Sequence, residues 1–257
     1  MALFKGKDLD KIGPVRSSRH YFLDYALEND AIYVHYGWSP QAQYDISNLG
    51  VNNINGISES ESSFWRVKDK RAPHNVATST AKILSIAERK GYKTTSTKES
   101  VLKYVTDEVE LTDGQSAEKI TIPYSYSNDV EYTYDATTKR YQRYSKGVKE
   151  TDWSTGENIT TKNIIITFAK NSVLNDGENK DRQTLSNIGT LNGYYITNGK
   201  AIKITCEKTS RSAQTVYKDL DGNEIKVNDG NTYVQICPIN AKVTIEGAEE
   251  TVTEDVD

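Results

Sequence analysis

Long apolar runs are absent from this sequence, and their absence excludes one class of protein. No stretch approaches the roughly 18–20 apolar residues that a membrane-spanning helix needs. The first ten residues, MALFKGKDLD, also lack the apolar core and the small-residue cleavage site of a signal peptide. Because charged residues make up 26% of the chain, we expect a folded protein with a polar surface.

A basic excess is absent as well. The chain has 32 lysines and arginines against 36 acidic residues, which gives a formal net charge of −4. General nucleic-acid binding requires a basic face that can contact phosphates. The composition therefore predicts no nucleic-acid partner.

Cysteine and histidine are scarce, which argues against a metal site. Cys206 and Cys237 show no CxxC spacing. The three histidines, His20, His35 and His74, lack the short spacings typical of zinc ligands. We therefore expect no metal and no cofactor. For the two cysteines, unpaired thiols are the favoured interpretation and a disulfide is the alternative.

Phenylalanine occurs only four times, whereas tyrosine occurs 17 times. A tyrosine at a half-buried strand position packs its ring and keeps its hydroxyl in water. The abundance of tyrosine therefore favours a β-rich protein with partly exposed sheet faces.

The first 92 residues show an α/β pattern. The segment RSSRHYFLDYALEND predicts a helix after Pro14 and two serines, and AIYVHYG predicts a strand that ends at Gly37. In SPQAQYDISNLG, Ser39 is the expected helix N-cap. FWRV predicts a short strand, and TSTAKILSIAERKGY predicts a helix that Thr78 or Ser79 caps and Gly91 terminates.

The remainder of the chain indicates strands and turns. Polar residues over 93–119 predict a connecting region that contains a short helix at 98–105. Beyond it, TKNIIITFAK predicts a buried strand, and DATTK and Asn198-Gly199 predict hairpin turns. The acidic end, EGAEETVTEDVD, predicts a disordered tail.

We therefore predict an α+β fold with two domains. An N-terminal α/β domain covers residues 1–106, and a β-rich domain of hairpins covers residues 107–242. The acidic tail covers residues 243–257.

The segment GPVRSSRH carries the first candidate site. Unpaired backbone N–H groups at a helix start attract anions, and Arg16 and Arg19 beside such an end would bind phosphate, sulfate or carboxylate. The alternative is that Ser17 or Ser18 only caps the helix, while the arginines pair with acids such as Asp24.

Two further segments place histidines at element boundaries. In VHYGWSP, His35 lies near a strand end and Ser39 at a helix start, where open α/β sheets bind ligands. Gly37 would allow a ligand close to the backbone. His35 shares a strand face with Tyr33, so a core position is an equal alternative. In FWRVKDKRAPHN, Asn75 is expected either to cap the next helix or to orient His74.

These segments also carry a family resemblance. MALFKGKDLDKIGPVRSSRHYFLDYALENDAIYVHYGWSPQA with FWRVKDKRAPHN resembles the N-terminal domain of the YerB-like family, bacterial proteins of unknown function, many of them predicted lipoproteins. YTYDATTKRYQRYSKG, TKNIIITF and DLDGNEIKVNDGNTYVQICPI resemble its C-terminal domain. The resemblance spans residues 1–240.

The resemblance implies both a location and a set of polar residues. It implies an extracytoplasmic protein held at the membrane by a lipid anchor, with a signal peptide and anchor that precede the present sequence. It makes a bridge between Cys206 and Cys237 chemically permissible, and it supplies no catalytic role. The polar signature of the family falls on Arg16, Ser17, Arg19, His35, Gly37, Ser39, Arg66, His74 and Asn75.

Three functional hypotheses follow. The leading one is a non-enzymatic envelope protein whose α/β domain binds an anionic small molecule or wall polymer through Arg16, Arg19 and Arg66, aided by His35 and His74. The second is a hydrolase of phosphodiester or glycosidic bonds in which a histidine acts as general acid or base. The third is a protein–protein adaptor whose arginines make internal ion pairs.

Overall fold

The computed structural model describes residues 1–125, 128–178 and 180–247, and the chain divides into two compact units. Unit 1 consists of Met1–Val101, Ser172–Ile188 and Lys208–Thr215. Unit 2 consists of Leu102–Asn171, Gly189–Glu207 and Val216–Asp257. Two stretches from the second half of the sequence thus belong to the same unit as the N-terminal segment.

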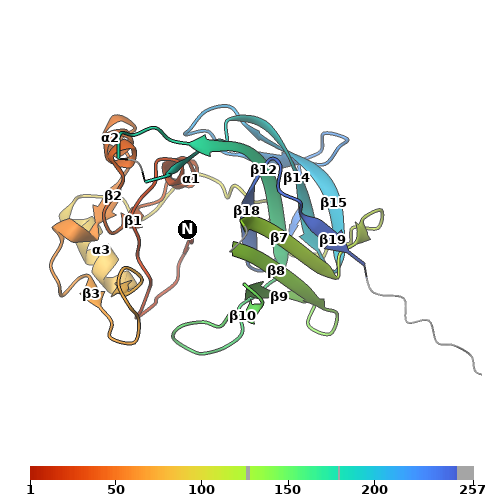
Figure 1. Cartoon of the computed structure of the whole chain (residues 1–257), viewed down its shortest axis with the longest axis horizontal. Helices are drawn as coiled ribbons and strands as arrows, with labels where there is room; N and C mark the ends of the chain where they lie inside the picture. The colour runs from red at the N-terminus through yellow and green to blue at the C-terminus, as the bar shows by residue number, and fades with distance from the viewer. Residues whose placement is uncertain (126–127, 179, 248–257) are drawn as a thin grey trace, which may run out of the picture. The chain divides into compact units, whose positions relative to one another are not determined.

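The described part of unit 1 contains three α-helices and four short strands that precede residue 93 (Figure 1). The helices are α1 (Phe22–Glu28), α2 (Pro40–Asn48) and α3 (Thr80–Arg89), and a 3-10 turn, η1, covers Gly56–Ser58. The strands are β1 (Tyr33–His35), β2 (Asn53–Asn55), β3 (Trp65–Arg66) and β4 (Val76–Ala77). β1 and β2 pair in parallel, and β3 and β4 pair antiparallel.

Apolar residues on opposite faces of the β1–β2 pair belong to different clusters. Tyr33 packs with Leu23 of α1 and Ile46 of α2. Val34, whose side chain points to the other face of β1, packs against the cluster that contains Phe64 and Ile86. The β1–β2 pair therefore lies between α1 and α2 on one face and α3 with β3 and β4 on the other.

The second half of the chain is mostly β-strand. Its first sheet has the order β10-β9-β8-β7-β19, and β11 also pairs with β9. These strands are β7 (Lys119–Ser125), β8 (Asn128–Asp135), β9 (Arg140–Ser145), β10 (Val148–Lys149), β11 (Thr160–Thr161) and β19 (Thr244–Glu246).

The second sheet has the order β13-β12-β14-β15-β16, with β18 on β12 and β6 on β15. Its strands are β6 (Gln115–Ser116), β12 (Asn163–Val173), β13 (Gln183–Ser186), β14 (Gly189–Thr197), β15 (Lys200–Lys208), β16 (Val216–Lys218) and β18 (Thr232–Pro238). A separate parallel pair joins β5 (Tyr104–Val105) to β17 (Val227–Asn228).

The core of unit 2 is formed by side chains from both sheets. Ile120, Ile122 and Tyr132 of the first sheet pack with Ile164 and Ile166 of β12. Figure 1 shows β7, β8 and β9 in green beside β12, β14 and β15. Burial of this contiguous apolar cluster is the main stabilising contribution to the unit.

Several local predictions are confirmed. The side chain of Ser39 accepts the N–H of Ala42 at the start of α2 (3.3 Å), and Ser79 accepts the N–H of Lys82 at the start of α3 (3.3 Å). Asn198 has φ 50° and forms the turn between β14 and β15 with Gly199. The chain is mostly β with few helices, as the tyrosine content and turn signals predicted.

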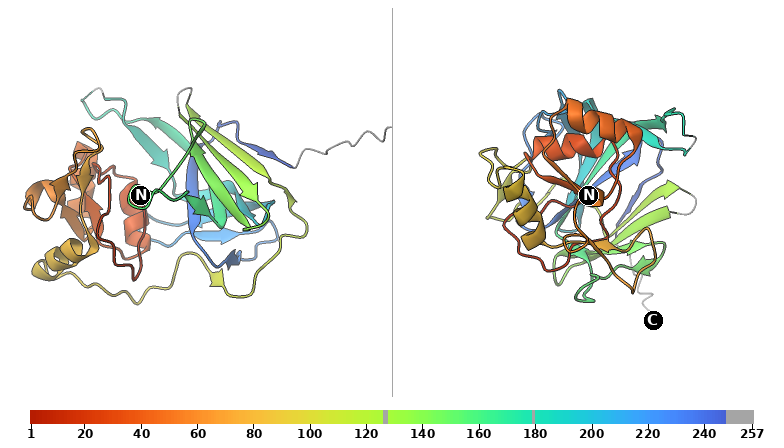
Figure 2. Two further views of the ribbon diagram at one scale, coloured as in Figure 1. Left: turned by 90° about the horizontal axis from the view of Figure 1, so that it is seen from below. Right: turned by 90° about the vertical axis from the view of Figure 1, so that its left-hand side faces the viewer.

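Three local predictions are wrong. Helix α1 starts at Phe22 with no side-chain cap, so the serines at 17 and 18 do not begin it. Residues 98–105 form no helix; Figure 2 draws residues 93–103 as an irregular yellow trace that leads into β5. Residues 244–246, predicted as part of a disordered tail, form β19 and pair with β7. Residues 248–257 lie outside the described part of the chain.

Candidate functional site

The segment that carries Arg16 and Ser17 lies beside residues 36–38, which come directly after β1 in the chain. The N–H of Tyr36 donates to the carbonyl of Arg16 (2.9 Å), and the N–H of Ser18 donates to the carbonyl of Gly37 (2.9 Å). The backbone N–H of Ser18 is therefore occupied by a partner within the chain. Because α1 starts only at Phe22, Arg16 does not flank a helix N-terminus, and any anion recognition by Arg16 depends on its side chain.

Arg16 extends to a loop that lies far along the chain. Its Nη1 atom is 2.5 Å from Nδ1 of His74 and 3.1 Å from Nε2, and the contact is exposed. A guanidinium group can only donate, so the imidazole nitrogen that Arg16 approaches accepts. Ser17 next to it donates its hydroxyl to the carbonyl of Tyr36 (3.1 Å).

Arg66 at the end of β3 makes the second set of contacts. Its Nη1 donates to Oδ1 of Asn75 (2.8 Å), and its guanidinium lies 5.5 Å from the centre of the Tyr36 ring. This distance is within the range of a cation–π interaction. Asn75 follows His74 in the chain, so Arg16 and Arg66 contact neighbouring residues of one loop.

We call Arg16, Ser17, Arg66, His74 and Asn75 the cationic cluster. Arg16, Arg66 and His74 are exposed. Within the residues that the structure describes, no ion pair links Arg16 or Arg66 to a carboxylate. The acid expected as a partner, Asp24, is bound instead by Nε of Arg211 (2.6 Å).

Gly37 borders this cluster, and its position requires a glycine. It has φ 80°, a conformation that residues with a Cβ rarely adopt. A Cβ there would lie 3.0 Å from Ile57 and 3.4 Å from the hydroxyl of Ser17. Its N–H donates to Oδ1 of Asn55 (2.9 Å), which holds the turn after β1 in place.

Three of the predicted site residues lie elsewhere. Arg19 donates to the carbonyl of Ser18 (2.9 Å) and is half-buried. Ser39 is buried and caps α2. His35 is 1% exposed and lies between the rings of Tyr33 and Trp38. Of the two interpretations of His35, the structure supports the core histidine.

The contacts and the burial of His35 have opposite effects on its pKa. Nδ1 lies 2.8 Å from the carbonyl oxygen of Gly37, and Nε2 lies 3.1 Å from Oδ1 of Asn53. These two oxygens favour the charged ring, but burial opposes it more strongly and lowers the pKa of His35 below its usual value. Because His35 is buried away from solvent, the hydrolase hypothesis is left with His74 as its general acid or base.

Sequence reasoning missed a buried ion network that completes unit 1. Arg211 donates to Asp45 (2.7 Å) in addition to Asp24, and Lys208 donates to Glu28 (2.7 Å). The Lys208 and Glu28 side chains are 2% and 4% exposed. The partners are more than 160 positions apart in the sequence, so no local pattern could have revealed the pairing.

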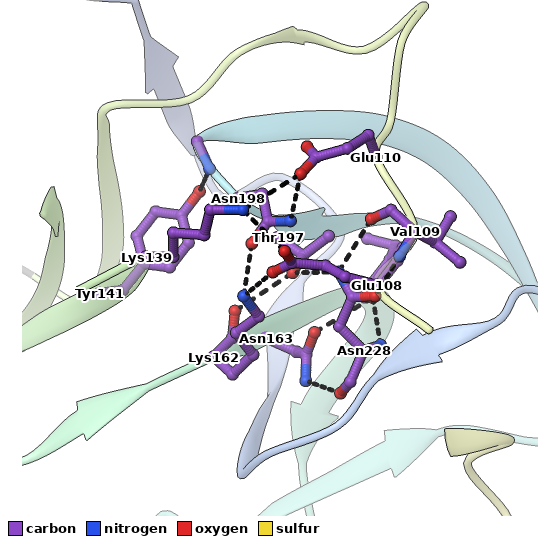
Figure 3. Close-up of polar contacts among 12 residues, drawn as sticks. Glu108, Val109, Glu110, Lys139, Tyr141, Lys162, Asn163, Thr197, Asn198 and Asn228 are labelled. Atoms are coloured by element: carbon purple, nitrogen blue, oxygen red, sulfur yellow. Dashed lines mark hydrogen bonds and ion pairs between the residues drawn. The ribbon is translucent and has the colours of Figure 1, made fainter. Parts of the chain in front are cut away.

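A second missed network lies in unit 2 around Lys162 and Glu108 (Figure 3). One signal was present in the sequence. Lys162 and Asn163 come directly before the apolar run IIIT, and two polar residues at the start of such a buried strand require hydrogen-bond partners.

Cys206 and Cys237 are both buried free thiols, so the interpretation as unpaired thiols is confirmed. Burial raises the pKa of Cys206 to about 12 and that of Cys237 to about 11, which keeps both protonated at neutral pH. Among the described residues, no group of three or more His, Cys, Asp or Glu is placed to hold a metal ion. None of the helices in that part of the chain has the length and apolar character to cross a membrane.

Comparisons with known proteins cover nearly the whole chain. Residues 1–93 match the model of the N-terminal domain, and residues 120–234 that of the C-terminal domain, of a family described as protein of unknown function (DUF3048). The chain is 30% identical over 246 residues to "Putative lipoprotein YerB" of Bacillus subtilis (strain 168), covering 93% of this chain and 70% of that protein. The crystal structure of the YerB protein from Bacillus subtilis is similar with a TM-score of 0.78 and 28% identity, over 91% of this chain and 78% of that one.

Proposed function

The chain belongs to the DUF3048 family, as its resemblance to YerB-like proteins predicted, and from this premise we propose that it is an extracytoplasmic binding protein for an anionic ligand. The ligand binds at the cationic cluster, and no reaction is catalysed there. Unit 1 is the α/β domain that carries the cluster, and the lipoprotein name of the Bacillus relative supports a location at the membrane surface.

One observation carries this proposal. Arg16 and Arg66 present exposed guanidinium groups toward one loop, and no carboxylate among the described residues pairs with them. Structural arginines commonly pair with acids, and Arg211 and Arg182 of this chain do so. Two arginines without a carboxylate partner are therefore available for an external anion.

The chemistry of the cluster favours a phosphate or carboxylate group. A guanidinium presents its N–H groups in a planar fork that matches the oxygens of either anion. The Tyr36 ring supports Arg66 from one side and limits the directions that its guanidinium can take. Phosphate groups of wall polymers and small phosphorylated molecules share this chemistry, and both are candidate ligands.

Calorimetric titration of the purified chain with inorganic phosphate and with wall-polymer fragments tests the proposal. We expect the double variant Arg16→Gln with Arg66→Gln to bind on the order of ten-fold more weakly or worse, since each charge-assisted hydrogen bond contributes about 1.5–3 kcal/mol. Arg19→Gln is the matched control and should bind as the wild type does. Equal binding by the double variant and the wild type would refute the site.

A further inference from the structure

Residues 103–110 include β5 and belong to unit 2. Tyr104 and Val105 pair in parallel with Val227 and Asn228. The N–H of Val227 donates to the carbonyl of Lys103 (3.0 Å). Backbone pairing between a peptide and a strand of its receptor is a recurring mode of peptide recognition. Residues 103–110 thus contact the rest of unit 2 as a bound peptide would.

The backbone of this segment is held at Val109 by one buried side chain. Oδ1 of Asn228 accepts the N–H of Val109 (2.7 Å), and Nδ2 of Asn228 donates to its carbonyl (2.9 Å) (Figure 3). Asn228 is 1% exposed. A side-chain amide that bonds both backbone groups of one residue recognises extended chain of almost any sequence at that position.

Other buried groups fix Asn228 independently of the segment. The hydroxyl of Tyr195 accepts the N–H of Asn228 (3.1 Å) and donates to Oδ1 of Asn163 (3.1 Å). The side chain of Asn163 in turn donates to the carbonyl of Asn228 (2.8 Å). The hydroxyl of Thr197 accepts from the side-chain amide of Asn228 (3.2 Å). The amide is therefore oriented by unit 2 before any peptide binds.

Two lysines contact the acidic side chains on either side of Val109. Lys139 donates to Glu108 (2.6 Å) and lies 3.4 Å from Glu110, while Lys162 donates to the other oxygen of Glu108. Asn198 accepts from Lys162 (2.6 Å) and donates to Glu110 (3.1 Å). Figure 3 shows both carboxylates directed at these donors.

The two sides of this contact, the lysine and asparagine side chains and the two glutamates, differ in burial. The Lys162 side chain is 11% exposed, and Asn163, Asn198 and Asn228 are buried, whereas Glu108 and Glu110 are exposed. A buried lysine is costly without a counter-charge. The segment therefore supplies the charge that the buried side lacks, and it does so mostly through polar contacts that can break without opening the apolar core.

We propose that unit 2 carries a recognition site for extended acidic peptides of the form Glu-x-Glu, and that the chain's own residues 108–110 occupy this site. We call Lys139, Lys162, Asn163, Asn198 and Asn228 the acceptor site. An acidic segment of a partner protein competes with residues 108–110 for it. The acceptor site shares no residue with the cationic cluster, so either proposal can fail without the other.

A peptide titration tests the proposal. The variant Glu108→Ala with Glu110→Ala is titrated with a labelled peptide of residues 103–111, KYVTDEVEL. We expect it to bind at least about ten-fold more tightly than the wild type, in which the tethered segment competes at an effective concentration on the order of millimolar. A peptide with both glutamates replaced by glutamine should bind at least about ten-fold more weakly, because it forms no charge-assisted hydrogen bonds.

Matched substitutions assign the binding to the acceptor site. In the double-alanine background, Lys162→Met is expected to abolish peptide binding, whereas Lys149→Ala, at an exposed lysine of β10, should leave it unchanged. A folded double-alanine variant that binds neither peptide, or that binds both equally, would overturn the proposal.

Hydrogen exchange on the wild-type chain gives a test that needs no variant. Excess KYVTDEVEL is expected to raise the exchange rate of the Val109 amide several-fold by displacing the tethered segment, and the glutamine peptide should leave that rate unchanged. The same exchange rate with both peptides would also overturn the proposal.

Discussion

The cationic cluster of unit 1 and the acceptor site of unit 2 both gather basic side chains, but they differ in the source of the opposing charge. Arg16 and Arg66 are exposed, and neither pairs with a carboxylate among the described residues. Lys162 is nearly buried, and the chain itself brings Glu108 to it. A hydrated guanidinium needs no partner for stability, whereas an enclosed ammonium does. An exposed cation without an internal partner is therefore a better indicator of an external ligand than a buried cation that the chain itself neutralises.

The largest expected effect concerns Lys208, whose side chain is more fully buried than those of Arg16, Arg66 and Lys162. Lys208 and Glu28 are almost wholly buried, and Glu28 also accepts from the N–H and hydroxyl of Thr215. Lys208→Met leaves that carboxylate without its counter-charge and should lower the free energy of unfolding by about 3–5 kcal/mol. Denaturant unfolding measures this change.

The paired variant Lys208→Met with Glu28→Met serves as the control. It removes both charges and should recover most of the lost stability. If Lys208→Met alone unfolds at the wild-type midpoint, burial is not what makes a cation depend on an internal acid, and the comparison fails.

The next effect separates His35 from the exposed His74. Burial lowers the pKa of His35 in the folded chain, so the unfolded chain binds more protons below the ordinary histidine pKa of about 6.5. The contribution of His35 to stability is therefore present above that pH and is lost as pH falls toward the lowered value. The fall in melting temperature between pH 7 and pH 5 should be smaller in His35→Gln than in the wild type, and an unchanged fall would contradict the buried position.

A smaller, local effect is expected at Glu108. Hydrogen bonds from Lys139 and Lys162 lower its pKa to about 2, from an ordinary value of 4.5. The charged form is thus favoured by the bound segment, and its contribution is lost as pH falls from about 4.5 to about 2. Amide exchange at Val109, corrected for its intrinsic pH dependence, should lose protection across this range in the wild type. Glu108→Gln should show low protection throughout and no such transition.

The smallest expected change in stability is at the cationic cluster. Arg16→Gln with Arg66→Gln removes exposed charges that pair with no acid, so the free energy of unfolding should change by no more than about 0.5 kcal/mol. Thermal unfolding measures it. A loss above about 2 kcal/mol would mean that these arginines hold the fold together and would favour the adaptor hypothesis.

Local signals predicted much of the fold. The caps at Ser39 and Ser79, the turn at Asn198 and the apolar strand β12 depend on residues a few positions apart, so the sequence alone indicated them. The start of α1 was mispredicted because Ser18 forms a β-bridge with Trp38, twenty positions away. A helix-start pattern carries no information about such a distant partner.

The candidate site was predictable to a smaller extent. The sequence drew attention to Arg16, Arg66 and His74, and the fold brings them to one loop. It could not separate them from His35, because alternation on a strand as short as β1 does not determine which polar residue becomes enclosed. For the acceptor site, Lys162 and Asn163 before an apolar run were a local signal, but the contact between Asn228 and Val109 was not predictable because the two residues are 119 positions apart.

One titration compares the two sites most directly. Backbone amide resonances of the wild-type chain are followed by NMR as inorganic phosphate is added. The account predicts shifts at Ser17, Gly37 and Asn75 beside the cationic cluster, and none at Val109 or Asn228, where Glu108 already supplies the negative charge. Shifts at Val109 and Asn228 with none at Ser17, Gly37 or Asn75 would contradict it.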